Sequence, residues 1–200
     1  QALTIDGAGH TIDATSSSRA LSVFPTTAPV TLEAIAIANG DGGGEGGAVW
    51  VDGPVMVTDS VISGSHSTAA GSAIGSRATV TLSRSTVTGN VGGGAVYSWT
   101  AVVLVDSTVV GNQGGGVNAG VSVTATNTTI VGNTSTGLGG GIYADSTATL
   151  DHVTLVGNSA PSAANVVATV VSPRASVIAG AAGGGGNCDR PATSRGYNWT

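Results

Sequence analysis

This 200-residue sequence contains an internal repeat, and one position of the repeat carries residue types that could do acid–base chemistry. We call the residues at this position the polar column. Asp59, Arg84, Asp106 and His152 recur at matching places in successive copies of a repeat, and Asp151 precedes His152. Glycoside hydrolysis uses two carboxyl groups roughly 5–9.5 Å apart, and a histidine can exchange a proton near neutral pH. These five residues are therefore the candidate catalytic set if the chain is an enzyme.

Two aromatic residues form a second candidate site. Trp50 and Tyr97 occupy equivalent places two repeats apart with Gly75 between them, and Trp99 and Tyr143 lie nearby in the pattern. If their rings face outward, they could stack on sugar rings or on a partner surface. If they face inward, they fill a widened corner. Glycine-rich turns shift the register here, so both alternatives stay open.

The elements that must position these residues belong to an internal repeat. A nine-residue block that ends at Asn90 returns with endings at Asn112, Asn133 and Asn158, and weaker copies end at positions 40 and 65. The intervals between endings are 25, 25, 22, 21 and 25 residues. Each repeat reads as a strand, a short polar corner, a second strand, an Asn/Gly turn and a third strand.

Apolar residues inside each block alternate with a period of two, which is typical of strands. The positions 10, 8 and 3 residues before the closing residue are aliphatic in every copy, as in Val80, Leu82 and Val87. The sequence predicts an all-β fold, a single-stranded parallel β-helix (β-solenoid) with about seven or eight coils of 21–25 residues. Residues 1–180 are assigned to this β-helix, and residues 181–200 to a glycine-rich C-terminal coil or tail that leads to a missing downstream segment.

The asparagine that closes the strongest copies is the most regular polar feature. Stacked asparagine side chains can hydrogen-bond along successive coils and satisfy backbone groups in the turns. A row of amides has no acid–base power. We therefore predict a structural ladder that consists of Asn90, Asn112, Asn133 and Asn158.

Composition excludes several classes of function. Charged residues make up 8% of the chain, against roughly 25% in an ordinary globular domain. All six basic residues are arginine, and the formal net charge is −5, so a basic surface for nucleic acid cannot be built. No apolar run approaches the ~18 residues of a membrane-spanning helix. We expect no nucleic-acid partner, no transmembrane segment, no cofactor and no metal site.

The repeat blocks resemble those of bacterial secreted right-handed parallel β-helix repeat proteins, the group related to polymorphic outer-membrane proteins and choice-of-anchor proteins. The matching motifs are 85–90 (STVTGN), 107–112 (STVVGN) and 139–142 (GGGI), together with the opening segment 3–12 and the ending 186–198. The resemblance implies a right-handed, pectate-lyase-like β-helix at an extracellular or cell-surface location. It also implies a second cysteine downstream, so Cys188 is either an unpaired thiol or pairs with another chain.

Lyases and hydrolases of this fold place carboxylates and a base on an outer face. The polar column described above offers one arginine, no lysine and no third stacked acid, and the short repeats leave no long loops to wall a substrate cleft. A surface ladder of ion pairs explains it as well. We therefore expect a non-enzymatic structural or adhesin-like β-helix that self-associates head to tail through its ends into a surface fibre or stalk, with carbohydrate or a host or cell surface as a further partner. The alternative is a β-helix that binds or degrades polysaccharides.

Overall fold

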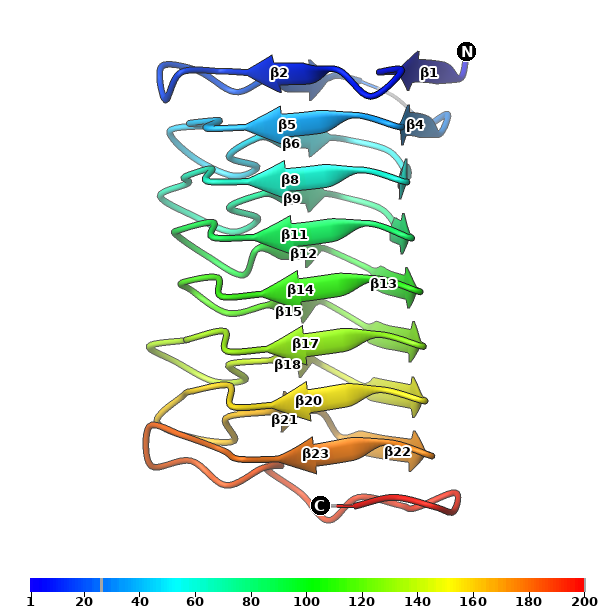
Figure 1. Ribbon diagram of the computed structural model, residues 1–200, viewed down its shortest axis with the longest axis vertical. Helices are drawn as coiled ribbons and strands as arrows, with labels where there is room; N and C mark the ends of the chain where they lie inside the picture. The colour runs from blue at the N-terminus through cyan, green and yellow to red at the C-terminus, as the bar shows by residue number, and fades with distance from the viewer. Residues whose placement is uncertain (26, 200) are drawn as a thin grey trace.

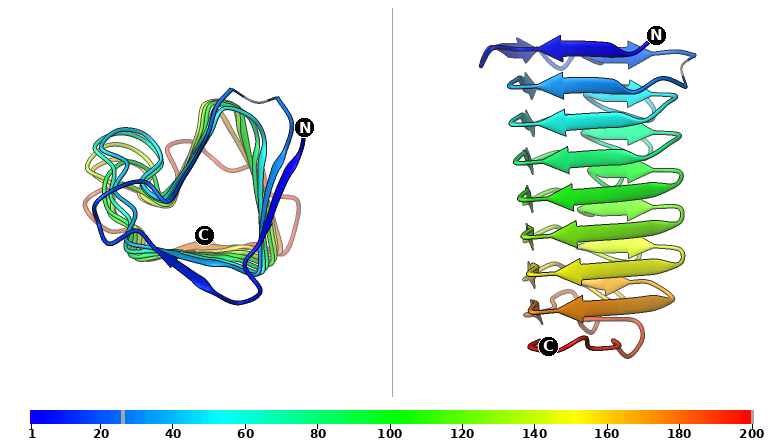
Figure 2. Two further views of the ribbon diagram at one scale, coloured as in Figure 1. Left: turned by 90° about the horizontal axis from the view of Figure 1, so that it is seen from above. Right: turned by 90° about the vertical axis from the view of Figure 1, so that its right-hand side faces the viewer.

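The computed structural model describes residues 1–25 and 27–199, and these residues form strands, turns and loops without a helix. The chain winds as a solenoid in which every strand pairs in parallel with its equivalent one coil away (Figure 1). Three sheets result, and they enclose a triangular core that is visible along the long axis (Figure 2). The predicted parallel β-helix is confirmed.

Each of the first seven coils contributes one strand to each sheet, in the order A, B, C, and the eighth contributes strands to sheets A and B. Sheet A contains β1 (Leu3–Asp6), β4 (Val30–Glu33), β7 (Val55–Thr58), β10 (Val80–Ser83), β13 (Ala101–Val105), β16 (Ser122–Thr126), β19 (Thr147–Asp151) and β22 (Val170–Arg174). Sheet B contains β2 (Thr11–Asp13), β5 (Ala36–Ala38), β8 (Val61–Ser63), β11 (Thr86–Thr88), β14 (Thr108–Val110), β17 (Thr129–Val131), β20 (Thr154–Val156) and β23 (Val177–Ala179). Sheet C contains β3 (Leu21–Val23), β6 (Val49–Val51), β9 (Ile74–Ser76), β12 (Val96–Ser98), β15 (Val117–Ala119), β18 (Ile142–Ala144) and β21 (Val166–Val167).

The core consists of aliphatic ladders in register. Val80 pairs with Val55 and Val102, and Val87 pairs with Ile62 and Val109. These side chains are at most 1% exposed, as the alternation predicts. Valine, isoleucine and leucine suit this narrow interior because strands favour stiff β-branched side chains that pack against their cross-strand neighbours.

The corner between sheets A and B turns on one residue in the left-handed backbone region. The φ angle at this place lies between 46° and 54° in every coil from the second to the eighth. The residues are Ala34, Asp59, Arg84, Asp106, Asn127, His152 and Ala175. The next residue in the sequence is buried in each of these coils. Where it is a serine, as in Ser60, Ser85 and Ser107, its hydroxyl accepts a backbone N–H from the preceding coil at 3.1–3.2 Å. This serine ladder holds the tight corner together.

The predicted asparagine ladder stands where sheet B ends. All four side chains are fully buried. In Asn112, for example, Oδ1 accepts both the backbone N–H and the Nδ2–H of Asn90 at 2.9 Å, and Nδ2 donates to Oδ1 of Asn133 at 2.9 Å. Asn165 and Asn187 extend the row beyond Asn158. The amides therefore carry hydrogen bonds from coil to coil through the protein interior.

Residues 181–199 continue the winding without regular strands. Bridges connect Ala182 to Ser159, Cys188 to Val166 and Trp199 to Val177, and the segment lies across the C-terminal end of the solenoid (Figure 1). Cys188 is half-buried against the core and forms no disulfide within the described residues. The predicted self-association through the ends stays a prediction. Nothing in the described part of the chain forms a helix long and apolar enough to cross a membrane.

Candidate functional site

The five candidate catalytic residues lie where sheet A turns into sheet B. Asp59, Arg84, Asp106 and His152 are the left-handed corner residues of their coils, and Asp151 is the last residue of β19. Asparagine, aspartate and histidine are several-fold enriched in that backbone conformation. The run of these types in the column is therefore explained by the turn, without any chemical role.

The N-terminal part of this column is an exposed ion ladder. Arg84 Nε lies 2.7 Å from Asp59 Oδ1, and Arg84 Nη2 lies 2.8 Å from Asp59 Oδ2. The Asn127 amide donates to Asp106 Oδ1 at 3.1 Å. The hydrogen bonds from Arg84 lower the pKa of Asp59, so this carboxyl group is ill-suited to act as a general acid near neutral pH.

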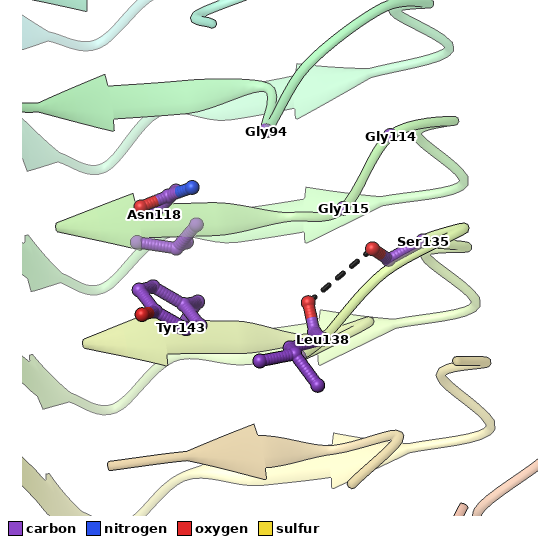
Figure 3. A pocket seen from close by; sticks show the side chains of 9 residues that line it. Gly94, Gly114, Gly115, Asn118, Ser135, Leu138 and Tyr143 are labelled. Carbon is purple, nitrogen blue, oxygen red and sulfur yellow. Dashed lines mark hydrogen bonds between the residues drawn. The ribbon is translucent and has the colours of Figure 1, made fainter. Parts of the chain in front are cut away.

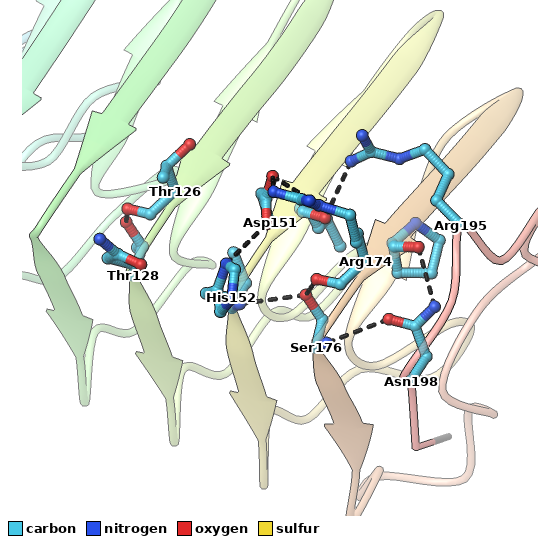
Figure 4. A network of polar contacts seen from close by, with 12 residues as sticks. Thr126, Thr128, Asp151, His152, Arg174, Ser176, Arg195 and Asn198 are labelled. Atoms are coloured by element: carbon cyan, nitrogen blue, oxygen red, sulfur yellow. Dashed lines mark hydrogen bonds and ion pairs between the residues drawn. The ribbon is translucent and has the colours of Figure 1, made fainter.

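The C-terminal part contains the polar network of Figure 4. Asp151 lies between Arg174 and His152. Its Oδ2 accepts from Arg174 Nε at 3.0 Å, and its Oδ1 is 2.6 Å from His152 Nδ1, a close contact that is not aligned as a hydrogen bond. Hydrogen bonding to Arg174 is the main cause of the lowered pKa of Asp151. The side chains of His152 and Arg174 are at least half exposed.

The candidate catalytic residues of this corner contribute little to the best-formed pockets of the described residues. Four of the best-formed pockets among the described residues do not include Asp106, Asp151 or His152 in their walls. Asp59 borders a shallow depression, but both of its oxygens are bound by Arg84. The geometry supports the ion-ladder interpretation of the column.

The aromatic candidates lie on the outer side of sheet C. Trp50 pairs with Gly75 and Gly75 pairs with Tyr97, as the sequence predicts. The Trp50 ring is nevertheless only 3% exposed, because it lies over Gly75 and under the guanidinium of Arg77, which is 5.7 Å from the ring centre. Trp50 lines a small pocket beside Arg77, but little of its ring is free to stack on a sugar. The binding role of Trp50 stays a prediction.

Arg77 also contacts Trp99, which the sequence places near the two aromatic candidates. Its guanidinium is 5.4 Å from the ring centre of Trp99, and its Nη1 is 2.8 Å from Asp52 Oδ1. Cation–π contact and the ion pair together fix the Trp99 ring at the corner between sheets C and A. The ring is 49% exposed, so an aromatic face is presented two residues after Tyr97.

Beyond Tyr97 the outward column of sheet C continues with polar and aromatic side chains. Tyr97 pairs with Asn118, and Asn118 pairs with Tyr143, on three successive strands. All three are partly exposed. Within the described residues, no hydrogen bond is formed by the Asn118 side-chain amide. Because neighbouring strands lie about 4.8 Å apart, the two tyrosines are separated by ~10 Å.

A pocket of about 290 Å³ lies beside Asn118 and Tyr143 (Figure 3). The loops between sheets B and C project from the triangle (Figure 2) and form its other wall, through Leu138 and the glycines at 94, 114 and 115. The pocket exists because the loops 91–95 and 113–116 are shorter than the neighbouring loop 134–141. We call Tyr97, Asn118, Tyr143, Leu138 and the pocket between them the sheet C groove.

Glycine is required where these short loops pass close to the neighbouring coils. A Cβ atom on Gly114 would come within 1.7 Å of the Gly92 carbonyl oxygen, and one on Gly94 within 2.9 Å of the Asn118 side chain. Sequence reasoning missed the groove, although the shortened repeat intervals of 22 and 21 residues signal it.

The described residues contain no group of three or more His, Cys, Asp or Glu side chains placed to hold a metal ion. The chemistry available in the groove is that of aromatic faces and an amide, with carboxylates at its margin. This set can bind a ligand through stacking and hydrogen bonds.

Comparison with known proteins gave one match, to a family model described as a right-handed β-helix region, over residues 3–172. No curated protein matched the chain. No solved structure matched it either. The family match covers most of the chain and agrees with the three-sheet solenoid in the structure. The chain therefore belongs to the right-handed β-helix family.

Proposed function

We propose that this chain is a non-catalytic, adhesin-like rod that acts outside the cell and binds an extended polysaccharide along the sheet C groove. The observation that carries the proposal is the row of Tyr97, Asn118 and Tyr143 on successive strands, beside a pocket and the exposed ring of Trp99. The structural role and the carbohydrate role predicted from the sequence are thereby combined in one surface.

Sugars suit such a surface for a physical reason. A pyranose ring has an apolar C–H face, which packs on aromatic rings, and a rim of hydroxyl groups, which hydrogen-bond to amides and carboxylates. The ~10 Å between the two tyrosines allows each to contact a different ring of an extended chain. The pocket volume of about 290 Å³ is close to the lower end of small-ligand sites, which fits a single sugar unit.

The absence of catalysis is proposed because two of the three candidate acids are held by arginines. Arg84 holds the Asp59 carboxylate and Arg174 holds that of Asp151. Both carboxyl groups lie at the corner between sheets A and B, and the groove lies over sheet C.

Binding is tested by affinity electrophoresis and calorimetry against a panel of soluble polysaccharides. Trp99→Ala and Tyr143→Ala should each weaken binding about fivefold, because each removes an aromatic contact worth on the order of 1 kcal/mol. Trp199→Ala is the matched control, since Trp199 is 69% exposed and lies in the C-terminal segment. If no polysaccharide binds, or if Trp199→Ala weakens binding as much as Trp99→Ala, the proposal is wrong.

Catalysis is tested on the same panel with and without calcium. We expect no release of reducing or unsaturated ends over days of incubation. Turnover that Asp106→Ala abolishes would instead establish the corner between sheets A and B as an active site.

A further inference from the structure

Two carboxylates, those of Glu45 and Asp145, act on the tyrosines of the sheet C groove. Asp145 follows β18 directly, lies two residues after Tyr143 and is exposed. Its carboxylate raises the pKa of the Tyr143 hydroxyl. Its backbone N–H donates to the Ala119 carbonyl at 3.2 Å, which fixes it at the edge of sheet C. Burial raises the pKa of Tyr97, and the negative charges of Glu45 and Asp145 raise it further.

The cations near the groove are already committed. Arg19 donates to the carbonyls of Gly42, Glu45 and Gly46, and Glu45 also faces the Arg19 charge. Arg77 is paired with Asp52 and lies between two tryptophan rings. The chain has no lysine, and the residues that line the pocket are uncharged. Asp145 is therefore the least compensated charge at the groove.

We infer that the groove prefers a polysaccharide that carries protonated amino groups and discriminates against uronic-acid polymers, and that Asp145 is the residue that determines this choice. The inference rests on the proposed function. An ammonium group beside Asp145 gains Coulomb attraction and a charge-assisted hydrogen bond, whereas a sugar carboxylate at the same place is repelled.

The Tyr143 hydroxyl lies near this carboxylate, because the Asp145 side chain is the main cause of the raised pKa of Tyr143. The carboxylate of the exposed Asp145 is available to a ligand. Asn118, whose amide lies one strand away from Tyr143, can accept or donate to the sugar hydroxyls. The three side chains together form a polar rim beside the pocket.

Calorimetry with hexamers of glucosamine, glucose and galacturonic acid tests the inference at low ionic strength. The glucosamine hexamer should bind about five- to tenfold more tightly than the glucose hexamer, and the galacturonate hexamer most weakly. Asp145→Asn should remove most of the preference for glucosamine and leave glucose binding within about twofold.

Glu33→Gln is the matched control, because it removes one exposed negative charge at the end of β4 in sheet A. It should leave the order of affinities unchanged. If Glu33→Gln weakens glucosamine binding as much as Asp145→Asn, the preference is a property of the net charge and the inference fails. It fails as well if all hexamers bind equally, a result that leaves the proposed function standing. If no hexamer binds, the proposed function fails with it.

Discussion

Removing one amide from the asparagine ladder tests the interior hydrogen bonding quantitatively. In Asn112→Ala the backbone N–H of the buried Asn90 loses its acceptor, and the Val87 carbonyl loses the donor at 3.2 Å. Each buried polar group left without a partner costs about 1–3 kcal/mol. The free energy of unfolding should therefore fall by ~3–5 kcal/mol, a large part of the 5–15 kcal/mol typical of a domain.

Urea denaturation followed by circular dichroism measures this difference. Asn112→Ser should lose less, because Ser65 stands at the equivalent place two coils earlier and its hydroxyl accepts the Gly40 N–H at 3.1 Å. The neighbouring Gln113→Ala is the surface control, since Gln113 is exposed. A loss for Asn112→Ala within about 1 kcal/mol of that for Gln113→Ala would show that water replaces the ladder, and would refute the reasoning.

Three further predictions concern other parts of the chain. Gly75→Ala places a methyl group 2.5 Å from Trp50 Cε3, so the ring must move. We expect the free energy of unfolding to fall by ~1–3 kcal/mol and the tryptophan emission to shift to the red. An unchanged emission spectrum would contradict this. Hydrogen bonds from arginines lower the pKa values of Asp59 and Asp151. The two carboxylates therefore stabilise the folded chain above pH ~4, and this stabilisation is lost as the pH falls below it. Between pH 5 and pH 3, the melting temperature of Asp59→Asn should fall less than that of the unsubstituted chain. Burial raises the pKa of the Cys188 thiol, so it should react with Ellman's reagent at pH 8 much more slowly in the folded chain than in urea, and equal rates would contradict the burial.

The ladders could be predicted from the sequence because they depend only on alternation and on identity. Val80, Leu82 and Val87 repeat with the coil, and so does the closing asparagine. Parallel stacking brings each residue onto its own copy, so no knowledge of distant contacts is needed.

The corner column was harder to interpret for a physical reason. Asp106 and His152 are residue types that both catalysis and a left-handed turn favour. Ala34 and Ala175 at the same place have no chemistry, and they share the same φ. The backbone conformation, which the sequence does not display, decides between the two explanations.

The groove was not predicted, because it arises from differences between coils. The exposure of the Trp50 ring depends on Gly75 in the next coil and on Arg77 at the corner. The pocket depends on the lengths of two neighbouring loops. The repeat pattern describes what the coils share and does not contain these differences.

The three corners of the coil tolerate change to different degrees. The corner between sheets A and B contains two residues in every coil from the second to the eighth, and four residues in the first coil. The loops between sheets B and C vary in length along the solenoid while the strands on both sides keep their register. After the first coil, differences in length therefore concentrate on one side of the rod. Ligand specificity could therefore change through the loops on that side while the three sheets stay the same.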